Sequence, residues 1–182
     1  MQKKDVKQVL YAVIDDIGKE KIRADVSSNI QSSEKYCAEI MRRCIQDLGD
    51  EAKEGEATGI LCEALLHFML TASLLPSERK VTVDGGIELD LVIPSVKNLA
   101  KNPDKTLVVQ IIKTSADIVK ISQAQAVQKN IENIWTISAR KIEYKGRNYH
   151  LGEAEFQYPS IVSDIHTFLV HKGVSSLKML HG

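Results

Sequence analysis

The chain has 182 residues, 43% of them apolar and 26% charged, which is enough for one domain with a proper core or for a domain with a small appendage. Its 24 basic and 24 acidic residues cancel, which counts against a tight, non-specific DNA binder with a global positive field. A nucleic-acid site would have to be a local patch, and the near-zero net charge suits a protein partner equally well.

The first 57 residues have the apolar spacing of helices and contain no sequence motif of a catalytic or binding site. We expect helices over residues 5–18, 20–31 and 33–48, the last closed by Gly49. Residues 49–59, GDEAKEGEATG, are charged and poor in apolar residues, so we expect a linker there. The chain then divides into an N-terminal helical region, 1–57, and an α/β core, 58–182. The N-terminal helices either cap that core or form a homodimer interface.

The three cysteines, Cys37, Cys44 and Cys62, have no metal-binding spacing. We interpret them as small buried apolar residues rather than a metal or redox set. Their odd number, and a beginning of the sequence that does not read as a signal peptide, lead us to expect a reducing, cytoplasmic location.

The pattern changes in the second region. We expect a helix over 58–75, strands over 79–84, 87–93 and 106–113, a helix over 116–132 and a strand over 134–139. A hairpin over 141–151, turning at Lys145-Gly146, and a helix over 160–171 follow. The apolar run 60–75 is too short to cross a bilayer, so we expect no membrane segment. In that run Glu63 and His67 share a helix face, which suits a packing pair or one flanking a site better than zinc ligands.

Two of the expected strands carry a polar group that a buried strand does not need: Asp90 in IELDLVI and Lys113 at the end of TLVVQIIK. The order helix, three-strand meander, helix, strand resembles the common core of the restriction-endonuclease-like, or PD-(D/E)XK, superfamily, in particular RecB-type nucleases and archaeal Holliday-junction resolvases. Members carry an aspartate on the second strand, (D/E)-x-K on the third and often G-x-x-x-E on the first helix. RecB-type members add a glutamine on the next helix. The matching residues here are Asp90, Lys113, Gly59 with Glu63, and Gln123 or Gln125.

The resemblance implies a Mg²⁺- or Mn²⁺-dependent phosphodiesterase (nuclease) with a mixed-sheet α/β fold. Asp90 and Glu63 would be metal ligands, and Lys113 would position water or stabilise the developing charge. One position departs from the pattern, because Ile111 stands two residues before the lysine, where the superfamily carries an acid. Gln110 becomes the substitute ligand if a bulge turns it to the same strand face. With one carboxylate fewer, we expect weak metal binding.

Residues 139–150 combine basic and aromatic side chains, which suits phosphate contacts plus base stacking but equally suits a solvated hairpin. The candidate nucleic-acid contacts are Arg140, Lys141, Lys145, Arg147 and Tyr149.

Three functions stay open. The first is a nuclease, or a nuclease-like protein with weakened catalysis, acting on DNA. The second is a non-catalytic module that binds nucleic acid or protein on the same scaffold. In the third, an unrelated α/β protein, Asp90 and Lys113 form a salt bridge or lie as exposed edge charges.

Overall fold

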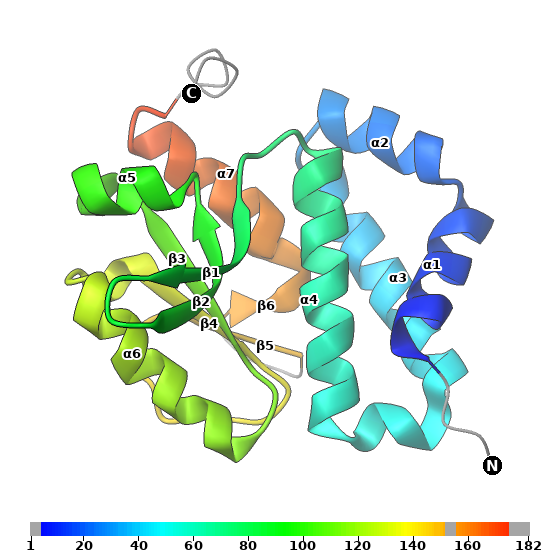
Figure 1. Ribbon diagram of the computed structural model, residues 1–182. Helices are drawn as coiled ribbons and strands as arrows, with labels where there is room; N and C mark the ends of the chain where they lie inside the picture. Colours follow the sequence, from blue (N-terminus) through cyan, green and yellow to red (C-terminus); the bar gives the residue numbers. More distant parts are fainter. Residues whose placement is uncertain (1–4, 152–155, 175–182) are drawn as a thin grey trace.

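The computed structural model of the chain describes residues 5–151 and 156–174. Within them, one mixed sheet has the strand order β1–β2–β3–β4–β5–β6 (Figure 1). The strands are β1 (Glu78–Val83), β2 (Ile87–Ile93), β3 (Leu107–Ile112), β4 (Ile134–Ser138), β5 (Asn148–His150) and β6 (Phe156–Gln157). The first three strands form an antiparallel meander, and β3 to β6 run parallel to one another.

Four helices precede the sheet. They are α1 (Val6–Ile17), α2 (Lys19–Ser28), α3 (Ser32–Leu48) and α4 (Gly55–Ala72), with a short 3-10 helix, Gly49–Lys53, before α4. Asp5 caps α1 by accepting hydrogen bonds from the backbone of Lys7 and Gln8, and Gly49 ends α3 with a positive φ of 59°. The segment expected to be a linker is therefore largely helical, and the proposed boundary at residue 57 falls inside α4.

The remaining helices lie between or after the strands. They are α5 (Val96–Lys101), α6 (Val119–Val127) and α7 (Ile161–His171), with 3-10 turns at Pro103–Lys105, Ser115–Ile118, Ile131–Asn133 and Tyr158–Ser160. The helix expected over 116–132 is thus shorter, because 3-10 turns replace both of its ends. Among the described residues no helix is both long and apolar enough to cross a bilayer.

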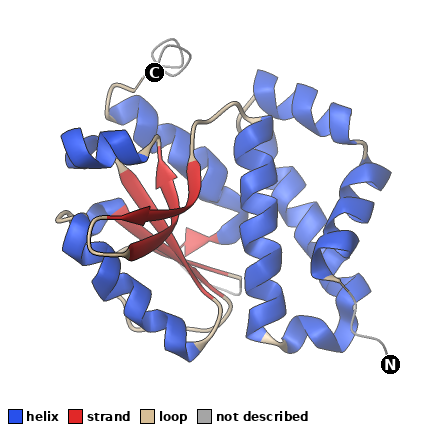
Figure 2. Cartoon of the chain, viewed as in Figure 1, coloured by secondary structure: helices blue, strands red, loops and turns tan. Residues whose placement is uncertain are grey.

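The sheet lies between two helical layers (Figure 2). On one face α4 separates the sheet from the N-terminal helices and α7 covers the parallel strands, while α5 and α6 cover the other face (Figure 1). Alternation along β3 produces this division, because Leu107, Val109 and Ile111 join the core cluster of the α4 side, whereas Val108 joins the smaller cluster of the α6 side.

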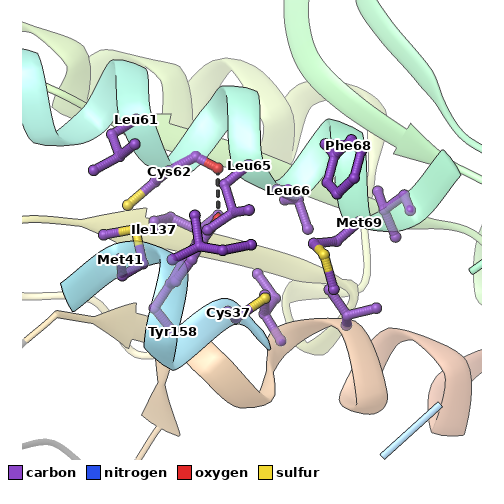
Figure 3. Close-up of a cluster of buried hydrophobic side chains, with 14 of the residues drawn as sticks. Cys37, Met41, Leu61, Cys62, Leu65, Leu66, Phe68, Met69, Ile137 and Tyr158 are labelled. Carbon is purple, nitrogen blue, oxygen red and sulfur yellow. Dashed lines mark hydrogen bonds between the residues drawn. The ribbon is translucent and has the colours of Figure 1, made fainter. Parts of the chain in front are cut away.

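The larger core is continuous from α1 to α7, and Figure 3 shows its centre around α4. The three described cysteines are buried there as free thiols, as the sequence predicted. Burial raises the pKa of Cys37 to about 12 and that of Cys44 to about 11, so both stay protonated at neutral pH. Tyr158, also fully buried, donates its hydroxyl to the Cys62 carbonyl at 2.6 Å. The division into two regions stays a prediction, but their apolar side chains share this core.

The hairpin prediction for residues 141–151 was wrong. Residues 139–147 form an irregular connection, and the strand that follows, β5, pairs parallel to β4. A parallel neighbour requires a crossover connection rather than a two-residue turn, so Lys145-Gly146 cannot close a hairpin.

Candidate functional site

Strands β2 and β3 separate at Asp90, and side chains replace the backbone ladder there. Their paired register runs from Ile93 with Leu107 to Leu91 with Val109 and stops before Asp90. Beyond that point the Asp90 amide donates to Gln110 Oε1 at 2.8 Å, and the Ile111 amide donates to Asp90 Oδ2 at 2.8 Å. The carboxylate of Asp90 therefore lies between β2 and β3 at the point where the two strands separate. Continued backbone pairing at this point would leave no space for it.

The counter-charge of Asp90 is Lys120, in the first turn of α6. Its Nζ lies 3.3 Å from Asp90 Oδ1 and 3.1 Å from Oδ2, and it also donates to the Ile111 carbonyl at 3.2 Å. Asp117 Oδ1 is 3.6 Å away. Asp117 also accepts from the Lys113 amide at 3.0 Å and from Thr114 in a capping box, which fixes the turn between β3 and α6.

Glu63 of α4 lies on the opposite face of β3 and holds Lys113, whose Nζ donates to Glu63 Oε2 at 2.5 Å. Arg79 and Lys80 lie 3.5 and 3.6 Å from Glu63 Oε1. Burial alone raises the pKa of Glu63, but the hydrogen bond and charge of Lys113 with the two other cations lower it overall, so Glu63 is ionised. Gly59, one turn earlier, makes room for the lysine, since a Cβ there would lie 2.5 Å from Lys113 Cγ.

The predicted site residues therefore come together only in part. Glu63, Asp90 and Lys113 surround the end of β3, yet each carboxylate pairs with a different lysine. Asp117 links the pairs, because it accepts a hydrogen bond from the Lys113 backbone amide and lies 3.6 Å from Lys120 Nζ. Lys80 of β1, which has a positive φ of 47°, reaches Glu63.

The residues present do not fit a divalent ion in this arrangement. Across residues 5–151 and 156–174, no group of three or more His, Cys, Asp and Glu side chains is placed to hold one. Ile111 is buried in the core of the α4 side. Gln110 keeps to the other face, where its Oε1 accepts from Asp90 and its Nε2 lies 3.4 Å from the Lys120 carbonyl. In this arrangement Gln110 hydrogen-bonds at the strand junction, and its role as a metal ligand stays a prediction.

A pocket of about 540 Å³ opens beside Lys113, where β3 and β4 end. Crevices at the carboxyl ends of parallel strands are the usual binding position in α/β sheets. Ile112, Ser138 and Ile118 form part of the wall. Its charged lining residues are Lys113, Arg140, Lys141, Glu54, Glu56 and Glu143, so basic and acidic groups are equal in number.

The expected nucleic-acid contacts separate into two sets. Arg140, Lys141 and Lys145 are exposed. In contrast, Tyr149 is fully buried and donates to Asp164 at 2.6 Å, while Arg147 donates to the Tyr149 hydroxyl and lies 4.5 Å from the centre of the Trp135 ring. Tyr149 packs in the core and cannot stack on a base.

The comparisons with known proteins agree with this architecture. No family model matches the chain, and no curated protein matches its sequence, but solved structures do match it. A restriction endonuclease PspGI–substrate DNA complex aligns with 92% of this chain and 94% of its own, at 10% identity and a TM-score of 0.54. Metal-depleted Ecl18kI in complex with uncleaved, modified DNA aligns with 92% and 80%, at 10% identity and a TM-score of 0.56. The chain has the restriction-endonuclease-like fold.

The structural similarity to these endonucleases covers more of the chain than the sequence resemblance, which began at residue 58. Residues 58–182 are only about two thirds of the chain, so a match over 92% includes much of the N-terminal helical region. At 10% identity the similarity establishes the fold but not the activity, which has to be inferred from the residues of the site.

Sequence reasoning missed Asp117 and Lys120. One signal was available, since Thr114-Ser115-Ala116-Asp117 has the S/T-x-x-D/E spacing of a helix start. A helix that begins there returns Lys120 toward the strand it has just left. Nothing in the sequence indicates that Lys120, rather than Lys113, faces Asp90.

Proposed function

We propose that this chain is a DNA-binding protein on a nuclease fold, in which metal-dependent phosphodiester cleavage is weak. The observation that carries the proposal is the pairing of both candidate carboxylates with lysines, Asp90 with Lys120 and Glu63 with Lys113. A divalent cation needs anionic oxygens that are not already neutralised, and here each carboxylate has an ammonium as its partner.

The similar structures support the DNA-binding part, since they are a complex of PspGI with substrate DNA and complexes of Ecl18kI with uncleaved DNA. We infer that DNA lies over the pocket at the carboxyl ends of β3 and β4. Arg140 and Lys141 at its rim are exposed and suited to phosphate contacts, with Lys145 on the same connection. Because acidic groups match the basic ones around the pocket, we expect few phosphates to be neutralised and binding to be salt-sensitive but modest.

Binding is tested by fluorescence anisotropy with duplex, flapped, branched and single-stranded DNA across a salt series. The double variant Arg140→Ala/Lys141→Ala should weaken binding and reduce the slope of log K against log salt by about 1 to 2, because each phosphate contact contributes about 0.9 to that slope. The matched control is Lys19→Ala/Lys21→Ala, which removes two exposed lysines from α2, away from the pocket (Figure 1). Equal losses in both variants, or no binding at low salt, would refute the proposed surface.

Cleavage is tested with the same DNA molecules in Mg²⁺ and in Mn²⁺. We expect little product with either metal. Efficient cleavage that disappears in both Asp90→Ala and Lys113→Ala would instead make the chain an active nuclease. A folded chain that binds no DNA in any form would favour the protein-binding alternative. Partner, oligomeric state and cytoplasmic location stay predictions.

A further inference from the structure

We propose that the ammonium of Lys120 is a built-in cation that occupies the cation position beside Asp90 and excludes divalent ions from it. The proposal does not depend on DNA binding, since it concerns metal binding by the chain alone.

The surroundings of Lys120 Nζ form a set of oxygens of the kind that holds hard cations. Both carboxylate oxygens of Asp90, the Ile111 carbonyl and Asp117 Oδ1 lie between 3.1 and 3.6 Å from it. Carboxylates that bind through both oxygens, together with a backbone carbonyl, are typical ligands of Ca²⁺ and related ions, at 2.3 to 2.6 Å for Ca²⁺. The distances seen here are those of an ammonium that donates hydrogen bonds rather than of a metal. The oxygens would have to close by about 1 Å around an ion.

The fold holds this ammonium in place from two sides. Asp117 fixes the turn that precedes α6, and Gln110, buried in β3, places its amide Nε2 3.4 Å from the Lys120 carbonyl. The side chains of Lys120 and Asp90 are 24% and 18% exposed, so the pair is sheltered but reachable by solvent ions. Lys120 is therefore a tethered cation beside the carboxylate, with an effective concentration that a soluble ion at moderate concentration does not reach.

Lys113 offers a matched comparison. It is also a partly buried lysine at the end of β3, but among the described residues its ammonium pairs with Glu63 on the other face and not with Asp90. Removal of Lys113 leaves Glu63 beside Arg79 and Lys80, still facing two positive charges. Only removal of Lys120 should leave carboxylates and a carbonyl without a cation.

The test measures Mn²⁺ binding to the chain in the absence of DNA. Binding is detected as a decrease in the EPR signal of free Mn²⁺ and as a change in the thermal unfolding temperature. Wild type and Lys113→Met should show no Mn²⁺ binding at this position. Lys120→Met keeps the apolar stem and should bind Mn²⁺ with an apparent Kd about ten- to a hundredfold below the highest concentration at which wild type shows no binding, since the ammonium no longer occupies the oxygen set. Mn²⁺ should raise the unfolding temperature of Lys120→Met, and Lys120→Met/Asp90→Asn should lose both effects.

Three results would overturn the proposal. The first is equal Mn²⁺ affinity in wild type and Lys120→Met. The second is a folded Lys120→Met that binds no Mn²⁺. The third requires no folded variant at position 120: wild-type protein whose unfolding temperature rises in Mn²⁺, with the rise abolished by Asp90→Asn, already admits the ion beside Lys120.

Discussion

Gly59 gives the sharpest test of how the Glu63–Lys113 pair is built. A Cβ at position 59 would lie 2.5 Å from Lys113 Cγ, 3.1 Å from its Cβ and 3.3 Å from its Cα. Since the first distance is shorter than real contacts allow and involves the stem of the side chain, Gly59→Ala must displace the lysine. The displaced ammonium loses its 2.5 Å hydrogen bond to a carboxylate that is only 9% exposed.

The magnitude follows from two opposing terms. Alanine in place of glycine inside a helix contributes about 1 kcal/mol of stability. Removal of one partner from a buried ion pair costs about 3 to 5 kcal/mol, and we take about 2 to 3 here because Arg79 and Lys80 remain near Glu63. The net expectation is a loss of about 1 to 2 kcal/mol, which lowers the unfolding temperature of a chain of this size by about 2 to 8 °C.

Urea unfolding of a double-mutant cycle measures this directly. In the Lys113→Ala background Cγ is gone, so Gly59→Ala should become neutral or stabilising by up to about 1 kcal/mol. Gly59→Ala that destabilises both backgrounds equally would show that the glycine serves some contact other than Lys113. Gly59→Ala that stabilises the wild type would show that the lysine is not held against α4.

Three further predictions concern single groups. Burial and the charge of Arg79 lower the pKa of His67, so the unfolded chain binds a proton there more readily than the folded chain. The free energy of unfolding should therefore fall as the pH drops below about 6.5. In urea unfolding, His67→Leu should show a smaller change of that free energy between about pH 7 and pH 5.5. Tyr158→Phe removes the hydroxyl that donates to a buried carbonyl and should cost about 1 to 2 kcal/mol in thermal unfolding, and a neutral result would contradict the hydrogen bond. Gln110→Leu leaves the Asp90 amide without its acceptor and should cost about 1 to 3 kcal/mol, with faster hydrogen exchange at that amide; unchanged exchange would count against the side-chain junction.

Most of the fold could be predicted from periodicity, because its strands and helices carry their patterns locally. IELDLVI was expected over 87–93 and forms β2 over Ile87–Ile93. The three cysteines on apolar helix faces are buried as expected. The hairpin prediction for residues 141–151 was wrong because it took Lys145-Gly146 as the signal of a tight turn. The parallel pairing of β5 with β4 is instead decided by long-range contacts.

The site was less predictable, for a reason that Asp90 illustrates. Sequence spacing gives the strand face of a residue, but it cannot give the partner that enters from another element. The lysine on the neighbouring strand was the natural candidate, yet α6 brings Lys120 to Asp90 and α4 takes Lys113 to Glu63. Both assignments depend on where two helices pack, which is a tertiary property that no local pattern of charges contains.

The pairing of Lys120 with Asp90 has an electrostatic explanation. A divalent ion at the end of β3 would need two anionic ligands for charge balance, and the apolar Ile111 withholds one of them. A single carboxylate is balanced by a single ammonium, which is what Lys120 supplies to Asp90. Loss of Lys120 alone would leave the carboxylate of Asp90, only 18% exposed, without its counter-charge, which is unfavourable. The side chain of position 111 lies on the opposite face of β3, in the core beside α4, so it contributes nothing to that balance.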